Sequence, residues 1–460
     1  MELYNVVSIE EAKKIINEEF SYTLDFEKIN VADSVGRYCF HDIIAQESIP
    51  NFKRSTVDGY AVATRDVFGA SEAIPAILEL VGEIMMGECP PCNIEKSAQC
   101  LYIPTGGMLP EGADSVVMVE YSSKLDENTI LIDSPVAPFE NVIQIGEDIK
   151  AGETIIKKGE HLRPYEIGVL SSLGIDQVFV YKKPVIGIIS TGDEIVSAGS
   201  KPELGKVRDI NTSLLWSSVM EAQAIPKSYG IINDDFDLLK NTVDQALEEC
   251  DIVLVSGGSS VGTKDQTLKV INSYKDGGVL VHGLAVKPGK PTIIGKAHNK
   301  VIFGLPGHPL ACSIIFTVFV KNYLDKLNGR SNNECIGNNS NINDNKKNSG
   351  SKSGSVNNGN GDTDGNGNGN SRSSNVSTNS SSGTLEFGVT AQFSINYHKA
   401  KGREEYLPVA LERVEGGIFA KPIFGKSGLI TSFSRAYGYI VINKNKEGIL
   451  EGEQVEVFKF

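Results

Sequence analysis

The sequence IVLVSGGSSVGTKD at residues 252–265 decides the fold class, because an apolar run of strand length leads directly into a glycine-rich loop. The same arrangement occurs at residues 185–194, where VIGIIS precedes TGDE, and at residues 301–309, where VIF precedes GLPGHP. Strands that alternate with helices indicate a parallel sheet with helices on both faces, which predicts an α/β domain over residues 181–330. The amphipathic helical patterns lie at residues 211–223, 236–249, 266–273 and 309–327.

The three loops after these strands are the first candidates for a binding site. In such sheets ligands bind beyond the carboxyl ends of the strands, and glycines let backbone N–H groups approach an anion closely. A helix that begins at Pro309 would add its positive N-terminal end. Gly257 and Gly262 have the separation of a phosphate-binding P-loop, but Thr263-Lys264 reverses the required Lys-Ser/Thr order. This order argues against a P-loop nucleoside triphosphatase, and the missing GxGxxG motif argues against a dinucleotide site.

A second candidate site is the segment VKPGKP at residues 286–291, which holds Lys287 and Lys290 in a frame stiffened by proline and glycine. The chain has 44 Lys and Arg against 58 Asp and Glu, and its formal net charge is -14. In so acidic a protein, two ammonium groups on one stiff loop are expected to bind an oxyanion. The same net charge argues against nucleic-acid and membrane-surface partners, because these need a basic face.

The other segments predict an N-terminal helix, two β-rich regions and a disordered tract. Ser8 begins a capping box, and the helical pattern after it extends to about Glu19. Short β patterns broken by Gly and Pro occupy residues 43–138 and 385–460. Of the 53 residues from 331 to 383, 38 are Asn, Ser or Gly. Such a tract buries too little apolar surface to offset the entropy of ordering it, so we expect a disordered insertion.

The cysteine content and the N-terminal residues predict a reduced, cytoplasmic compartment. The seven cysteines are an odd number, and residues 1–20 are acidic and amphipathic rather than a secretory signal. The CxxC at residues 89–92 has no second ligand pair at zinc spacing. The longest apolar run, residues 311–320, is too short to span a bilayer, so no membrane insertion is expected.

Seven short motifs occur together in one order along the chain. They are DGYA at 58–61, PTG at 104–106, GED at 146–148, TGDE at 191–194, SGG through Asp265 at 256–265, KPGKP at 287–291 and LPG at 305–307. Together they closely resemble the molybdopterin molybdenumtransferase family, which includes bacterial MoeA, the E domain of gephyrin and the plant molybdenum insertases. The resemblance covers essentially the whole chain except the Asn/Ser/Gly tract.

The resemblance implies a multidomain α/β plus β fold. Its parts would be an elongated discontinuous domain at 1–45 and 139–180, an inserted β domain at 46–138, a three-layer α/β molybdopterin-binding domain at 181–330, the disordered tract at 331–383 and a C-terminal β-barrel domain at 384–460. Family members are homodimers, and the site lies between the α/β domain of one protomer and the β domain of the other.

The resemblance also implies an enzyme that converts adenylylated molybdopterin and molybdate into molybdenum cofactor and AMP, assisted by a divalent cation, usually Mg²⁺. Glu194 and Asp265 are the first choices as its ligands. The acidic positions implied to be catalytic are Asp58, Asp148, Glu194, Asp234 and Asp265. Those implied to bind molybdate are Ser256, Lys287, Lys290, Arg403 and Ser432. Those implied to bind the pterin substrate are Thr105, Gly106, Thr191, Gly192, Gly257, Gly258, Pro306, Gly307 and His308.

Two other functions stay open at this point. The α/β domain type is shared with the molybdopterin adenylyltransferase, although that enzyme is normally this domain alone and the motifs at Asp58 and Thr105 argue against it. Gephyrin also acts as a non-enzymatic scaffold through its E domain. The chain departs from the family pattern at His308, where Asn is usual, and at Tyr437, where Asn or Asp is common.

Overall fold

The apolar runs of the α/β alternation form the centre of a six-stranded sheet, in the order β16-β13-β17-β21-β20-β18. Four neighbouring strands of this sheet are parallel. They are β16 (Ile225–Ile232), β13 (Val185–Thr191), β17 (Ile252–Ser256) and β21 (Lys300–Leu305). The last three are buried along almost their whole length, which explains why their sequences are continuously apolar rather than alternating.

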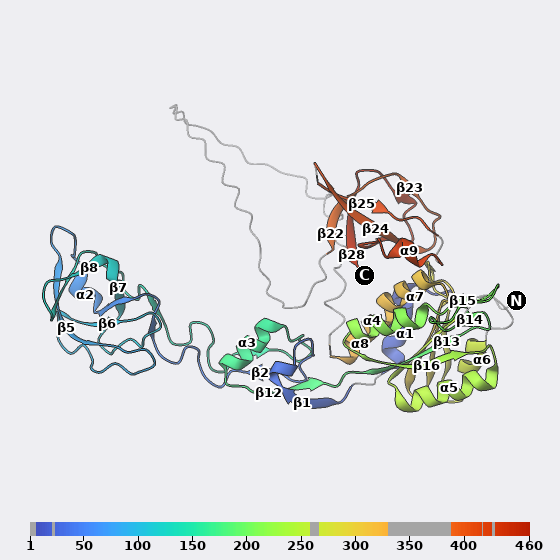
Figure 1. Ribbon diagram of the computed structural model, residues 1–460, viewed down its shortest axis with the longest axis horizontal. Coiled ribbons are helices and arrows are strands. Elements are labelled where there is room, and N and C mark those ends of the chain that lie inside the picture. The colour runs from blue at the N-terminus through green and yellow to red at the C-terminus, as the bar shows by residue number, and fades with distance from the viewer. Residues whose placement is uncertain (1–5, 21–23, 258–265, 330–387, 416, 426–427) are drawn as a thin grey trace, which may run out of the picture. The chain divides into compact units, whose positions relative to one another are not determined.

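The structure, a computed structural model, describes residues 6–20, 24–257, 266–329, 388–415, 417–425 and 428–460. These residues belong to two compact units. One unit is residues 25–182, and the other combines residues 1–24 with residues 183–460. Figure 1 shows the elements of each unit.

Helices cover both faces of the six-stranded sheet, as Figure 1 shows. On one face, α5 (Phe236–Glu249) and α6 (Gln266–Asn272) pack their apolar sides against the strands in one buried cluster. On the other lie α4 (Asn211–Glu221) and α7 (Pro309–Ile315). The predicted three-layer α/β domain is therefore confirmed.

Two strands of this sheet were not predicted, and one runs against its neighbours. β20 (Ile293–Ala297) is antiparallel to β21 on one side and to β18 (Gly278–His282) on the other. His298 and Asn299 join β20 to β21, and both have positive φ, at 50° and 59°. A two-residue turn of this kind makes an antiparallel hairpin, so the sheet is mixed rather than wholly parallel.

Residues 309–327, for which the sequence predicts one helix, form a continuous helical segment with a π-helical stretch in its middle. α7 continues into a π-helical stretch at Phe316–Lys321 and then into α8 (Asn322–Leu327). Most of the segment is buried, which accounts for its apolar sequence. Within the described ranges, this and every other helix is too short or too polar to cross a membrane.

The C-terminal residues form the predicted barrel. Its five strands follow the order β24-β25-β22-β28-β26, and β26 pairs back to β24 to close it. Phe393, Val409 and Ala420 are completely buried in its core. The elements are β22 (Val389–Phe393), β23 (Tyr397–His398), β24 (Glu404–Val414), β25 (Gly417–Pro422), α9 (Ile430–Phe433), β26 (Gly438–Ile442), β27 (Gly448–Ile449) and β28 (Gln454–Lys459).

The first helix, α1 (Ile9–Glu19), belongs to the unit that contains the α/β domain. The Lys326 ammonium of α8 donates to the Phe20 carbonyl oxygen at 2.9 Å, just beyond the end of α1. The division of the chain therefore differs at this point from the expected one, which grouped residues 1–45 with residues 139–180.

The other unit contains a second six-stranded sheet, in the order β7-β4-β6-β5-β9-β8. Two buried apolar clusters flank it, because successive residues of β4 contribute to opposite faces. The strands are β4 (Gly59–Val62), β5 (Ala76–Glu83), β6 (Gln99–Ile103), β7 (Ser115–Met118), β8 (Ser122–Lys124) and β9 (Thr129–Ile132), with the short helix α2 (Thr64–Val67).

Three antiparallel strand pairs, one α-helix and a short 3-10 helix (Val31–Asp33) lie in the rest of this unit. The pairs are β1 (Phe26–Asn30) with β12 (Gln177–Tyr181), β2 (Ile43–Ile44) with β11 (Thr154–Ile156), and β3 (Arg54–Ser55) with β10 (Val142–Ile143), and the helix is α3 (Pro164–Ser172). Because each pair joins a segment before the six-stranded sheet to one after it, the sheet is an insertion in the sequence.

Candidate substrate site

The ends of β13, β17 and β21 bring the three glycine-containing loops to one edge of the sheet. Ser256 is in register with Ser190 on one side and with Leu305 on the other. The N–H of Gly257 donates to the Leu305 carbonyl oxygen at 3.3 Å. The loops therefore start side by side, as expected for strands whose carboxyl ends share one edge.

Gly257 shows why this edge requires glycine. Its φ is +108°, and a Cβ atom there would lie 2.0 Å from the Thr191 carbonyl oxygen. A Cβ atom on Gly307 would lie 3.8 Å from the Cα atom of Gly257. Backbone from all three loops is thus packed together at this edge without side chains between.

Asn211, the first residue of α4, ties two of these loops together. Its Nδ2 atom donates to Ser256 Oγ at 2.7 Å and to the Gly307 carbonyl oxygen at 2.9 Å. The side chain is buried, and its Oδ1 atom has no hydrogen-bond partner among the described residues. Ser256 is itself only 1% exposed, so it lies beneath the loops rather than on an open surface.

Cys312 of α7 lies next to Ser256 but is not an activated nucleophile. Complete burial raises the pKa of the Cys312 thiol to about 12, although the Ser256 side chain acts in the opposite direction. The thiol is therefore neutral at physiological pH, and its role here is packing.

Acidic side chains follow both β13 and the neighbouring strand β16. Thr191 Oγ1 donates to Asp234 Oδ1 at 2.8 Å, and the N–H of Asp234 donates to Asp193 Oδ1 at 3.1 Å. Glu194 Oε2 lies 3.0 Å from the position that a Cβ atom on Gly192 would occupy. Thr191 and Asp234, two of the residues that the resemblance singles out, are thus in direct contact, and Gly192 and Glu194 follow Thr191 in the same loop.

Two predicted site residues, Gly258 and Asp265, lie outside the described residues. Within the part of the chain that the structure describes, no three His, Cys, Asp or Glu side chains are grouped to hold a metal ion. A magnesium ion commonly takes one or two carboxylates together with substrate phosphates, so it requires no such group. The exposed carboxylate of Glu194 is of the hard oxygen type that this ion prefers.

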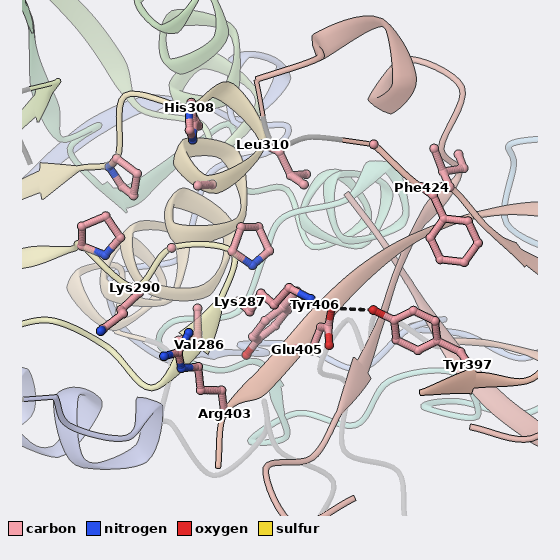
Figure 2. Close-up of a pocket in the computed structure, with 17 residues that line it drawn as sticks. Val286, Lys287, Lys290, His308, Leu310, Tyr397, Arg403, Glu405, Tyr406 and Phe424 are labelled. Carbon is pink, nitrogen blue, oxygen red and sulfur yellow. Dashed lines mark hydrogen bonds and ion pairs between the residues drawn. The ribbon is translucent and has the colours of Figure 1, made fainter. Parts of the chain in front are cut away.

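A pocket of about 510 Å³ lies beside the glycine loops, between the 286–291 segment and the barrel (Figure 2). Within the 286–291 segment, β19 (Val286–Lys287) pairs in parallel with the start of β24, which places Lys287 opposite Glu405. The predicted site residues that line the pocket are Lys287, Lys290, Pro306, His308 and Arg403.

Glu405 is the acidic side chain of this pocket, and it is buried. Its Oε1 atom accepts from Lys287 Nζ at 2.8 Å and from the Tyr397 hydroxyl at 2.8 Å. Burial, followed by the hydrogen bond to Glu405, raises the pKa of Tyr397, so the hydroxyl stays protonated and donates. A buried carboxylate needs such partners because it has lost its water.

Two predicted site residues lie at or near the departures from the family pattern. His308 is one of these departures, and Ser432 precedes the other, Tyr437, by five residues. His308 precedes α7 and is exposed, and its side chain does not cap that helix. A Cβ atom on Gly428 would lie 3.7 Å from His308 Cδ2, so the segment before α9 passes beside the histidine. Ser432 belongs to α9, but its side chain is outside what the structure describes, and its predicted role stays a prediction.

In the other unit, Asp58, Thr105 and Gly106 form one compact turn. The backbone N–H and the hydroxyl of Thr105 both donate to Asp58 Oδ1, at 2.7 and 3.1 Å. Gly106 has a φ of +81°, which fits a glycine. Asp148, another predicted acidic residue, is exposed in the turn after β10, and its N–H donates to the Ile49 carbonyl oxygen at 3.1 Å.

Sequence reasoning missed Asn211, Glu405 and Tyr397. A polar residue at the start of a helix is ordinarily interpreted as a helix N-cap, so nothing in the sequence places Asn211 at the edge of the sheet. For Glu405 there was a signal: it lies two residues after Arg403, where an extended segment puts both side chains on one side.

Three family models match the chain in order. They are the MoeA N-terminal region (domain I and II) at residues 7–174, a probable molybdopterin binding domain at residues 187–326, and the MoeA C-terminal region (domain IV) at residues 390–460. Two solved structures of the MoeA protein from Pyrococcus horikoshii superpose with TM-scores of 0.73 and 0.76, at 33% and 28% identity, over 99% of this chain. They cover 99% and 100% of those chains.

Named relatives agree with these matches. A molybdopterin biosynthesis protein of Methanocaldococcus jannaschii is 31% identical over 99% of this chain and 98% of its own length. The molybdopterin molybdenumtransferase of Bacillus subtilis is 33% identical over 64% of this chain and 69% of its own. Gephyrin of Dictyostelium discoideum is 32% identical over 71% of this chain but only 50% of its own length. The chain therefore belongs to the molybdopterin molybdenumtransferase (MoeA) family.

Proposed function

We propose that this protein inserts molybdenum from molybdate into adenylylated molybdopterin, yielding molybdenum cofactor and AMP. The observation that carries the proposal is the continuity between the glycine loops and the cationic pocket. Leu305 is in register with Ser256 at the sheet edge, and the next residue, Pro306, lines the pocket together with His308. A substrate that carries a phosphoanhydride and must meet an oxyanion needs both features within reach of one another.

The glycine loops are proposed to bind the phosphate portion of the pterin substrate. Gly257 lets the loop backbones pack closely, Gly307 is exposed beside it, and Asn211 holds their two loops in one arrangement. Main-chain N–H groups bind phosphate without adding charge to an acidic protein. The Oδ1 atom of Asn211, which has no partner among the residues that the structure describes, is suited to accept from a substrate N–H or a water molecule.

The pocket is proposed to bind molybdate, which is a dianion. Lys287 and Lys290 provide compact ammonium charges from one loop, and Arg403 provides a planar fork from the barrel side. With Glu405 as the opposing carboxylate, these charged groups leave a net charge of two positive, which offsets that of molybdate.

A magnesium ion is proposed as the cofactor. Glu194 and Asp265 would hold it, with phosphate oxygens of the substrate completing its coordination. When bound, the ion would supply positive charge to the phosphoanhydride. Asp234, fixed by the Thr191 hydroxyl, is proposed to orient groups around it from the same loop cluster.

A homodimer is also proposed, on the basis of the family resemblance. Asp58, Thr105 and Asp148 would then act from one protomer on substrate bound to the sheet edge of the other. The Thr105 hydrogen bonds hold the Asp58 carboxylate in one orientation, which suits a group that must meet a separately bound substrate.

The test is release of AMP from adenylylated molybdopterin in the presence of Mg²⁺, with and without molybdate. We expect AMP and active cofactor only when molybdate is added. Tight binding of the pterin substrate without molybdate-dependent release would instead favour a gephyrin-like scaffold. Adenylylation of molybdopterin from ATP would favour the adenylyltransferase.

A further inference from the structure

We propose that Glu405 and Tyr397 are positioning residues that hold the Lys287 ammonium in place for molybdate. The inference rests on the proposed function, because it assigns a task to side chains of the molybdate pocket. Neither residue belongs to the motifs that identify the family. Glu405 accepts from the Lys287 ammonium, and Tyr397 donates to the same carboxylate.

The strand pairing fixes the relation between Lys287 and Glu405. β19 and β24 are parallel and put the two residues opposite each other, so their side chains meet across two segments more than a hundred residues apart. The Glu405 side chain is 7% exposed, whereas the Lys287 side chain is 60% exposed. The carboxylate is therefore the buried partner, and the lysine is the exposed side chain that it orients.

Tyr397 anchors the carboxylate from the opposite side, as Figure 2 shows. Its hydroxyl donates to the same Oε1 atom that accepts from Lys287. Its ring is stacked on Phe424, with centroids 5.8 Å apart and an interplanar angle of 25°. The position of the Glu405 carboxylate is thus set by the barrel before any ligand enters.

An ammonium group has three N–H donors, and the contact with Glu405 engages one of them. The others remain able to donate to an oxyanion in the pocket. A free lysine side chain loses rotamer freedom when it binds, whereas one already held by Glu405 loses less. The carboxylate also repels an anion, so a variant that deletes its charge would mix two opposite effects.

Two variants that keep the net charge separate positioning from repulsion. Glu405→Asp shortens the carboxylate by one methylene, and Tyr397→Phe removes the anchoring hydroxyl. Each should raise the half-saturating molybdate concentration about three- to tenfold, in line with the ordering cost of one long side chain. The rate at saturating molybdate and the KM for the pterin substrate should stay unchanged.

Matched controls make the same chemical changes elsewhere. Glu412→Asp alters another carboxylate of β24, which accepts from Lys421 at 3.1 Å rather than from a residue that lines the pocket. Tyr274→Phe removes another hydroxyl-to-carboxylate bond, to Asp244 at 2.7 Å in the α/β domain. Neither control should shift the molybdate titration, even if it lowers the melting temperature.

The deciding experiment repeats both test variants in a Lys287→Ala background, with molybdate binding also measured directly by titration calorimetry. We expect neither Glu405→Asp nor Tyr397→Phe to have any further effect there, because a positioning residue acts through the lysine. A shift that persists without Lys287, or no shift in its presence, would overturn the inference while leaving the proposed function intact. If Lys287→Ala itself leaves the molybdate titration unchanged, the assignment of this lysine in the proposed function is wrong as well.

Discussion

Lys287 and Lys290 lie three residues apart in one loop, yet the structure gives them different surroundings. Lys287 extends from β19 and is paired with Glu405, whereas Lys290 follows Gly289, whose φ is +115°. A Cβ atom on Gly289 would lie 2.7 Å from Ile315 Cδ1, so the loop packs directly on the end of α7. The backbone direction at Lys290 is therefore set by the packing of its loop on α7.

Lys290→Ala is expected to raise the molybdate concentration needed for half-maximal rate by about one to two decades. The lost charge-assisted hydrogen bond accounts for about 1.5–3 kcal/mol. Lys290→Arg should restore little of the lost molybdate affinity, because a planar guanidinium group does not fit the place of a compact ammonium in a rigid loop. Molybdate and pterin titrations of each variant measure this, with the exposed Lys269→Ala of α6 as the control.

An unchanged molybdate curve together with a shifted pterin curve would show that Lys290 binds phosphate instead. The sequence could identify both lysines because proline and glycine beside them indicate a stiff loop. The spacing of Glu405 from Arg403 places both on one side of an extended segment, but the contact of Glu405 with Lys287 could not be predicted, because it depends on a strand pairing between distant segments.

At the scale of elements, the site depends on where β13, β17 and β21 end. Alternation of apolar runs and helical patterns was sufficient to predict these strands and the meeting of their loops, because parallel strands share a carboxyl edge. It was not sufficient for β18 and β20, which lack the intervening helix that the pattern requires and pair through the His298-Asn299 turn. The contact between Asn211 of α4 and the loops also could not be predicted, because it depends on tertiary packing rather than on a local sequence pattern.

Asn211→Ala is expected to lower stability by about 1–3 kcal/mol and to weaken binding of the pterin substrate. The change removes both donors and leaves the Ser256 hydroxyl and the Gly307 carbonyl without this partner in a buried place. Asn211→Asp is the matched variant: it keeps the shape but has no N–H to donate to the carbonyl, so it should restore neither property.

Denaturant unfolding and equilibrium binding of adenylylated molybdopterin measure the two effects of the Asn211 variants. Full stability and affinity in Asn211→Asp would contradict the view that the two donated hydrogen bonds hold the loops together.

At the scale of the whole molecule, motifs in both units identify the family, while the chain between residues 331 and 383 carries none of them. Composition alone indicates that this tract contributes little to the core, because it has almost no apolar residues. The arrangement of the two units and the number of protomers depend on contacts that motifs do not encode. Replacing a whole segment or mixing whole protomers therefore tests how separate parts of the chain contribute to one activity.

Replacing residues 332–382 by a short flexible linker is expected to leave the melting temperature and the rate of AMP release nearly unchanged. Flexible linkers of Gly and Ser impose little strain as long as they span the gap. The measurement is thermal unfolding beside the activity assay. A large fall in melting temperature would mean that the tract packs on the folded parts.

Mixed dimers test whether residues of the two units act across protomers. Asp58→Asn and Lys287→Ala homodimers should each be impaired, the first in turnover and the second in molybdate use. If one site combines the Asp58 unit of one protomer with the Lys287 unit of the other, co-refolded mixtures should recover activity through one intact site per mixed dimer. No recovery in a mixture shown to contain mixed dimers would place both residues of a site on the same protomer.

The most direct measurement of the central claim is a single-turnover assay. Protein loaded with adenylylated molybdopterin and Mg²⁺ is mixed with molybdate or with sulfate, and AMP is quantified per protomer. The account predicts up to one AMP per occupied site with molybdate, little with sulfate, and a right-shifted molybdate curve in Lys290→Ala. AMP release that is independent of molybdate, or stable binding of the pterin substrate with no release at any molybdate concentration, would contradict it.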